Sequence, residues 1–180
     1  MIVFYGKSSS GKSEQAEKKS VAEAKRKNCP LVYLATMAND GSQAAMMRIA
    51  HHKSLRAGKG FTTIEEPLDL TNTFEKCQGA VVLLECLSNL LANKQYALYG
   101  DKPMDETEII QLAETIFQDI IGLSNHCSQL IVVTNDIFDT KASDAWCQSY
   151  MRTLGLINYK LAQEALEFVE VSFGICNRLK

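Results

Sequence analysis

The sequence has few of the features that would tie a protein to a membrane or to nucleic acid. No stretch approaches the roughly 18 consecutive apolar residues of a membrane-spanning helix, and the N-terminus lacks the pattern of a signal peptide. The net charge is −2 and the isoelectric point is about 5.9, so the chain has no overall basic field to collect nucleic acid. We therefore expect a soluble cytoplasmic protein whose partners are small molecules, with no nucleic acid and no membrane span.

The cysteines form no C-x-x-C pair. Neither a zinc site nor a redox motif is indicated, and reduced thiols in a cytoplasm are the simplest interpretation. Arginine is also scarce and dispersed, which argues against the arginine-rich lid that clamps phosphates in nucleotide kinases. The six cysteines are Cys29, Cys77, Cys86, Cys127, Cys147 and Cys176.

What the sequence does contain is GKSSSGKS, directly after the apolar run Ile2–Tyr5. It fits the P-loop pattern G-x-x-x-x-G-K-S, with a strand-like segment before it and a helix-like segment after it. Backbone N–H groups and the positive end of the next helix would cradle phosphate. Lys12 would reach the β- and γ-phosphates, and the Ser13 hydroxyl would ligate Mg²⁺. A glycine- and serine-rich turn that matches by accident is the alternative. The expected phosphate-binding residues are Gly6, Lys7, Ser8, Ser9, Ser10, Gly11, Lys12 and Ser13.

Short apolar runs alternate with longer segments of helical spacing. Strands that are apolar on both faces and separated by helices indicate a parallel sheet covered on both sides. We therefore expect a three-layer α/β, P-loop NTPase-like fold with a mostly parallel sheet, in a single domain over residues 1–180. The expected strands are Ile2–Tyr5, Leu31–Ala35, Ala80–Leu84, Leu130–Thr134 and Val169–Phe173, and the expected helices are Glu14–Lys27, Gln43–Arg56, Leu87–Leu98, Glu106–Asn125 and Asp144–Glu167.

Ligands of such open sheets bind beyond the carboxyl ends of the strands. Glu85 follows the run VVLL, where P-loop enzymes place a carboxylate that holds Mg²⁺ directly or through water. Asp136 follows another strand and is a second candidate at the same rim. Exposed residues at strand ends are the structural alternative for both.

His51 and His52 lie side by side in the segment after the second strand. Neighbouring helix positions differ by about 100°, so at most one of the two can aim at a given point. Near a phosphate site, a histidine can be a general base, a phosphate contact or a nucleophile that attacks phosphorus. A pair of solvent-facing helix residues is the structural alternative.

In order and spacing, these motifs resemble the bifunctional adenosylcobinamide kinase / adenosylcobinamide-phosphate guanylyltransferase family of cobalamin biosynthesis. The resemblance covers nearly the whole chain. After the P-loop, it includes LVYLAT (Leu31–Thr36), R-I-x-x-H-x-x-x-R (Arg48–Arg56), F-x-T-x-E-x-P (Phe61–Pro67), LLECLSNLLAN (Leu83–Asn93), VTND (Val133–Asp136) and R-x-x-G-x-x-N (Arg152–Asn158).

The resemblance implies two reactions on one corrinoid. ATP or GTP phosphorylates adenosylcobinamide, and GMP from GTP is then joined to that phosphate through a guanylyl-histidine. The histidine that is guanylylated in the family corresponds to His52, and His51 is the second candidate. Lys12 assists catalysis. The nucleotide site would also include Thr36, Lys53, Arg56, Glu65 and Glu85, with Mg²⁺ held by Ser13 and Glu85. The resemblance further implies a homo-oligomer, with a trimer as the expected form.

The chain departs from the family's pattern at three places. Ser9 stands where the family usually has arginine, Ala44-Ala45 replace a Glu-Met pair, and Ile137–Thr140 replace a Gly-rich loop. A member with one activity or a changed acceptor therefore stays open. An ordinary small-molecule or nucleotide kinase also stays open, as does a nucleotide-switched binding module, although the chain lacks the N-K-x-D motif that such a module needs.

The segment after Asp144 predicts an amphipathic helix. Apolar residues recur at spacings of three and four, which indicates a stripe facing the core more than a ligand platform. The stripe consists of Trp146, Tyr150, Leu154, Ile157 and Leu161.

Overall fold

A computed structural model of the chain describes residues 1–38, 41–137 and 144–180. Within helix α2, the side chains at positions 44, 45, 48, 51, 52 and 55 lie outside the description. The elements in chain order are β1 (Ile2–Gly6), α1 (Lys12–Lys27), β2 (Leu31–Ala35), α2 (Gln43–Arg56), β3 (Thr62–Glu65), two short 3₁₀ turns (Leu70–Thr73 and Glu75–Cys77), β4 (Val81–Glu85), α3 (Leu87–Tyr99), α4 (Glu106–His126), β5 (Gln129–Asn135), α5 (Ala145–Glu164), β6 (Glu167–Ser172) and β7 (Ile175–Arg178).

The strands form one sheet in the order β3-β2-β4-β5-β1-β6-β7. The pairs from β3 to β6 are parallel, and β7 pairs with β6 in the antiparallel direction. Ala35 on β2 stands beside Glu85 on β4 and Glu65 on β3, and Gly6 stands beside Asn135. The carboxyl ends of the parallel strands therefore meet at one edge of the sheet.

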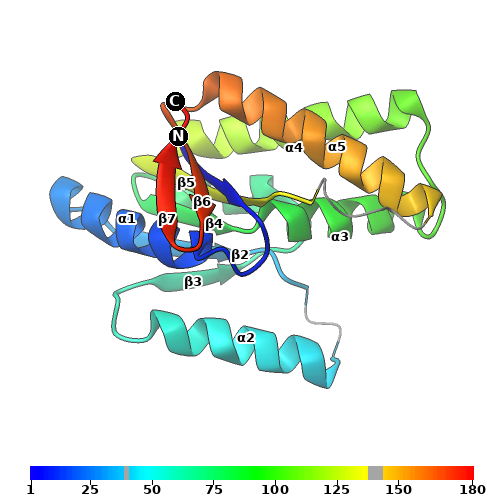
Figure 1. Cartoon of the computed structure of the whole chain (residues 1–180). Helices are drawn as coiled ribbons and strands as arrows, with labels where there is room; N and C mark the ends of the chain where they lie inside the picture. Colours follow the sequence, from blue (N-terminus) through cyan, green and yellow to red (C-terminus); the bar gives the residue numbers. More distant parts are fainter. Residues whose placement is uncertain (39–40, 138–143) are drawn as a thin grey trace.

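Helices cover both faces of the sheet, which confirms the three-layer prediction (Figure 1). Side chains alternate between the faces along each strand, so Val82 and Leu84 pack in the core with α3, α4 and α5. Val81 and Leu83 pack in the other core, which α1 covers. Helix α2 lies beside the β3 edge of the sheet, away from the other helices (Figure 1).

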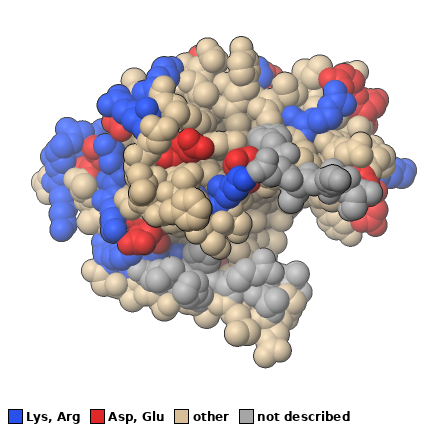
Figure 2. Space-filling model, in the orientation of Figure 1, with Lys and Arg blue, Asp and Glu red and all other residues tan. Residues whose placement is uncertain are grey.

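The helix ends follow local chemistry. Helix α4 begins with a capping box, in which Asp105 accepts from the Glu108 amide and Glu108 accepts from the Asp105 amide. These bonds satisfy N–H groups that the first helical turn leaves without partners. Helix α1 ends in Lys25, Arg26 and Lys27, where cations are favoured by the helix dipole. Basic side chains gather over α1 on the left of Figure 2, with acidic side chains among them.

The predicted stripe on α5 is confirmed for its central residues. Leu154, Ile157 and Leu161 are fully buried in the core with α3 and α4. Tyr150 packs against that core, and Trp146 stacks on Tyr150 while donating its indole N–H to the Gly100 carbonyl. No helix in the described part of the chain is long and apolar enough to cross a membrane.

Two strands and several element boundaries differ from the sequence prediction. Strands β3 and β7 are absent from the sequence prediction because both are four-residue edge strands with mostly exposed side chains, so their apolar pattern is weak. The last predicted helix ends at Glu164 instead of Glu167, since Glu167 already pairs with Ile2 on β1. Phe173, expected at the end of a strand, lies in the turn between β6 and β7.

Candidate functional site: a P-loop and the pocket beside helix α2

The P-loop joins β1 to α1 and depends on two glycines. A Cβ on Gly6 would lie only 2.4 Å from the Val171 carbonyl oxygen, so a side chain there would displace the loop. Gly11 has a φ of 91° and is the N-cap of α1, a conformation that favours glycine. Because glycine supplies no capping side chain, the first N–H groups of α1 are available to an anion. This geometry is suited to phosphate.

Lys12 is buried at the start of α1. Its ammonium donates a hydrogen bond of 2.9 Å to the Lys7 carbonyl, which holds the side chain across the loop. Burial lowers the pKa of Lys12, while Cys86 and Glu85 act in the opposite direction. The ammonium is therefore placed within the loop that would hold a triphosphate.

Glu85 ends β4 and is 8% exposed. Burial raises the pKa of Glu85, and the neighbouring Ser13 hydroxyl, which can donate to the carboxyl group, acts in the opposite direction. The Glu85 Oε2 is buried without a hydrogen-bond partner among the described residues. A hydroxyl and a carboxylate are ligands that Mg²⁺ accepts, and an unpartnered buried oxygen is the kind of group that a cation would satisfy. The residues present fit a magnesium ion.

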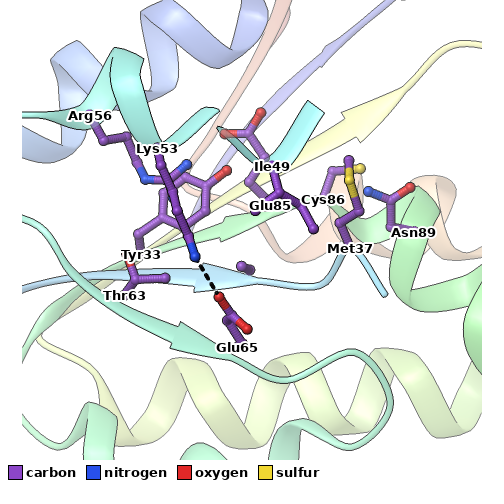
Figure 3. A pocket seen from close by; sticks show the side chains of 11 residues that line it. Tyr33, Met37, Ile49, Lys53, Arg56, Thr63, Glu65, Glu85, Cys86 and Asn89 are labelled. Atoms are coloured by element: carbon purple, nitrogen blue, oxygen red, sulfur yellow. Dashed lines mark hydrogen bonds and ion pairs between the residues drawn. The ribbon is translucent and has the colours of Figure 1, made fainter. Parts of the chain in front are cut away.

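A pocket opens beside the P-loop, between α2 and the ends of β2, β3 and β4 (Figure 3). On one wall, the Arg56 guanidinium lies 3.4 Å from the centroid of the Tyr33 ring. Arg56 is 6% exposed, and its Nη1 is buried without a hydrogen-bond partner in the described part of the chain. On the other wall, Lys53 pairs with Glu65 at 3.1 Å. The pocket thus combines an aromatic surface with donors and a carboxylate.

One face of α2 borders this pocket. Ile49, Lys53 and Arg56 line it and recur at spacings of four and three, as residues on one helical face do. Position 52 falls on this face by the same repeat, three residues after Ile49 and four before Arg56. Position 51 does not. The side chains of His51 and His52 lie outside the described residues, so their predicted roles stay predictions.

The end of α2 is joined to α1 by a second contact. Lys59, three residues beyond Arg56, pairs with Glu17 on α1 at 2.5 Å. The Glu17 side chain is 3% exposed, so the pair lies at the edge of the α1 core. Glu17, Lys59 and Tyr33 are not among the predicted site residues, because nothing in the local sequence distinguishes them from ordinary helix, loop and strand residues.

Thr36 is placed differently from the other predicted residues. It is fully buried, its hydroxyl donates to the Cys86 carbonyl at 2.7 Å, and its amide donates to the Glu85 carbonyl. Asn93 on α3 donates to the Thr36 carbonyl. In this structure Thr36 braces the end of β2 against the β4–α3 junction, and its predicted nucleotide contact stays a prediction.

The structure gathers most of the predicted site at the carboxyl edge of the sheet. Lys53, Arg56, Glu65 and Glu85 line the pocket at the ends of β2, β3 and β4, and Glu85 also interacts with Ser13 of the P-loop. Asp136 lies on the other side of the loop, in a depression that it shares with P-loop residues and β6. Of the residues that depart from the family pattern, 138–140 and the side chains at positions 44 and 45 lie outside the described residues.

Comparisons with known proteins match the same family along nearly the whole chain. A family model described as "Cobinamide kinase / cobinamide phosphate guanyltransferase" matches residues 2–179. The "Bifunctional adenosylcobalamin biosynthesis protein CobU" of Escherichia coli (strain K12) is 29% identical over 188 residues, covering 100% of this chain and 99% of the relative. The protein of the same name from Salmonella typhimurium strain LT2 is 28% identical with the same coverage.

Among solved structures, the flagellar accessory protein FlaH from Methanocaldococcus jannaschii is similar with a TM-score of 0.48 and 14% sequence identity. The similarity covers 99% of this chain and 77% of the FlaH chain.

Proposed function

This chain belongs to the cobinamide kinase / cobinamide phosphate guanyltransferase family, and on that premise we propose that it performs two successive transfers to adenosylcobinamide. The observation that best supports the proposal is the P-loop. Lys12 and the Ser13–Glu85 pair lie on the same side of this loop as the pocket between α2 and the ends of β2, β3 and β4, called the α2 pocket below. In the first transfer, the hydroxyl of the aminopropanol arm attacks the γ-phosphorus of ATP or GTP. The bond to the β-phosphate oxygen breaks, ADP or GDP leaves, and the hydroxyl proton passes to solvent.

In this phosphoryl transfer the protein positions the phosphates and offsets charge. N–H groups of Ser8–Gly11 and the first turn of α1 would hold the phosphate oxygens. Lys12 would move from the Lys7 carbonyl, which it contacts here, to the β- and γ-phosphates. When bound through Ser13 and Glu85, Mg²⁺ supplies positive charge beside those phosphates.

In the second transfer, an imidazole nitrogen of His52 attacks the α-phosphorus of GTP and pyrophosphate leaves. A phosphate oxygen of the corrinoid then attacks the same phosphorus, and the N–P bond breaks, giving adenosylcobinamide-GDP and regenerating the histidine. The helical repeat of α2 supports His52 over His51, since position 52 shares a face with pocket residues Ile49 and Arg56.

The α2 pocket is proposed to hold guanine. The Glu65 carboxylate can accept hydrogen bonds from the N1–H and N2–H donors of guanine, which adenine does not present together. Lys53 already holds Glu65 at the pocket wall, and the Arg56 guanidinium has an unused buried N–H group that could donate to a phosphate oxygen or to the base. The Glu65 contact would favour GTP over ATP in the second transfer.

The test uses GTP labelled at the α-phosphate, with Mg²⁺. We expect label on the wild-type protein that is lost in acid and retained in alkali, as a phosphoramidate requires. His52→Ala should abolish the label, whereas the matched variant His51→Ala should retain it. Label that persists in His52→Ala and disappears in His51→Ala would overturn the assignment, and an unlabelled wild-type protein would overturn the transferase.

The kinase reaction is tested separately with γ-labelled ATP and adenosylcobinamide. Label on the corrinoid supports the kinase activity and, together with the labelled histidine, supports both activities in one chain. Protein labelling without corrinoid phosphorylation would identify a member with a single activity, which the departures at Ser9, Ala44-Ala45 and Ile137–Thr140 leave open. Rapid phosphorylation of a nucleoside monophosphate would instead identify an ordinary nucleotide kinase.

We also propose that residues 1–180 act as one domain and assemble into a homo-oligomer. A single sheet runs through the described residues from β1 to β7, which supports the first part. Sedimentation equilibrium tests the second part, with a trimer as the expected form.

A further inference from the structure

The turn between β6 and β7 has an unusual residue at its tip. Ser172 pairs with Ile175, so Phe173 and Gly174 form a two-residue hairpin turn. Their φ angles are 54° and 77°, and positive values at both positions are what a type I′ turn requires. Asn-Gly is the usual pair in such a turn. A bulky aromatic residue is disfavoured there, so turn formation does not explain Phe173.

This turn is tied to the P-loop. The Gly174 amide donates to the Ser10 carbonyl at 2.8 Å, and the Gln15 side chain on α1 donates to the Gly174 carbonyl at 3.0 Å. A Cβ on Gly11 would lie 3.0 Å from the Gly174 Cα, so the two backbones are in close contact. Phe173 is therefore held at a defined place relative to the phosphate cradle.

Phe173 is 98% exposed, yet it lines a depression formed with the P-loop. Lys7, Ser8 and Glu170 are among the other lining residues, which are polar or glycine, so Phe173 supplies the apolar surface. The Glu170 carboxylate beside it is unfavourable for a phosphate group. A flat, uncharged part of a ligand is what fits against the ring.

We propose that Phe173 is a stacking platform for the purine base of the nucleoside triphosphate that donates the γ-phosphate. The phosphates would lie on the P-loop, and the base would extend over the β6–β7 turn. Stacking on an aromatic ring accepts every base, because each presents a π face. Such a platform would accept ATP and GTP alike as the phosphate donor.

The platform lies on the opposite side of the P-loop from the α2 pocket. β1 stands between β5 and β6, with the α2 pocket above β2, β3 and β4 and the turn beyond β6. The inference rests on the proposed function, in which two nucleotides serve two transfers. The base position on Phe173 would accept adenine and guanine, and the base position in the α2 pocket would select guanine.

The test compares wild type with Phe173→Asn and Phe173→Tyr by calorimetric titration of non-hydrolysable ATP and GTP analogues with Mg²⁺. Asparagine suits the turn but cannot stack, so we expect the affinity for the ATP analogue to fall about tenfold, whereas the GTP analogue keeps the guanine position in the α2 pocket and should lose less. Tyrosine should retain the affinity for both analogues. Inorganic tripolyphosphate, which has no base, is the control ligand and should bind all three proteins equally.

Three results would overturn the inference. Equal affinity of Phe173→Asn and wild type for the ATP analogue would show that the ring does not contact the base. A parallel loss of tripolyphosphate affinity would mean that Phe173 only supports the loop. An effect confined to the KM for the corrinoid, or to the sedimentation coefficient, would assign the ring to the acceptor or to a second copy of the chain. Because analogue binding requires no turnover, failure of histidine labelling in the wild type remains a separate result about the proposed function.

Discussion

The Arg56 guanidinium stacks on the Tyr33 ring at 3.4 Å, and both side chains are almost completely buried. The contact joins the last residue of α2 to the second strand of the sheet. Together with the Lys59–Glu17 pair, it anchors the end of a helix that otherwise lies beside the β3 edge (Figure 1). The proposed nucleophile is one helical turn before this anchor, so its position depends on Arg56.

Arg56→Ala should slow guanylylation of the protein by about 10- to 100-fold. A desolvated cation–π contact contributes about 2 kcal/mol, and its loss would leave the end of α2 poorly placed. The measurement is the rate of protein labelling from α-labelled GTP, with thermal unfolding as a check on the fold. Tyr33→Phe keeps the ring and is the matched control, for which we expect a rate near wild type. An unchanged rate in Arg56→Ala would contradict the anchoring role.

Glu85→Gln should lower activity and raise the stability of the ligand-free protein. Without the carboxylate, we expect kcat to fall about a hundredfold or more, since charge stabilisation at the phosphates is lost. The same change removes a carboxyl group with an unpartnered buried oxygen, and we expect the free energy of unfolding to rise by about 1–3 kcal/mol. Urea unfolding in EDTA at pH 8 measures this gain. Equal stability of the two proteins at pH 8 would contradict it.

The pH dependence of this gain follows from the direction of the pKa shift. Burial raises the pKa of Glu85 above its ordinary value of 4.5, so the folded protein holds the proton more tightly than the unfolded chain does. The contribution of Glu85 to the free energy of unfolding is fully present below pH 4.5, and it is lost as pH rises through the raised pKa of the folded protein. The difference in unfolding free energy between Glu85→Gln and wild type should therefore narrow toward pH 4.

Lys59→Ala should destabilise the protein by about 1–3 kcal/mol, because it leaves the buried Glu17 carboxylate unpaired. Removing one partner of a buried pair costs about 3–5 kcal/mol, and we expect less here because the Lys59 side chain is 37% exposed. Chemical unfolding at pH 7 measures the effect. The double variant Lys59→Ala/Glu17→Gln removes the unpaired charge and should recover most of the loss. A double variant no more stable than Lys59→Ala would show that the charge is not the cause.

The sequence predicted the parts of the fold that depend on local pattern. The central strands β1, β2, β4 and β5 are apolar on both faces, and their runs were recognisable without any knowledge of their neighbours. The edge strands β3 and β7 were missed, because their side chains are mostly exposed and their pairing depends on β2 and β6. An edge strand is defined by its partner more than by its own composition.

The candidate site divides in the same way. The P-loop and the carboxylate after β4 are read from consecutive residues, because a tight turn and a strand end are local features. The Arg56–Tyr33 stack, the Lys59–Glu17 pair and the contact of Gly174 with Ser10 join elements that are distant in the chain. Their formation depends on strand order and on which helix covers which face.

By itself, the sequence determined that the chain has a P-loop motif in a layered α/β fold and resembles one family. Only the tertiary structure decided that β6 lies next to β1, which brings Phe173 to the P-loop, and that α2 ends on Tyr33. The physical reason is that hydrophobic periodicity specifies which elements form and which faces are buried. The order of strands in the sheet is decided by the packing of the whole chain.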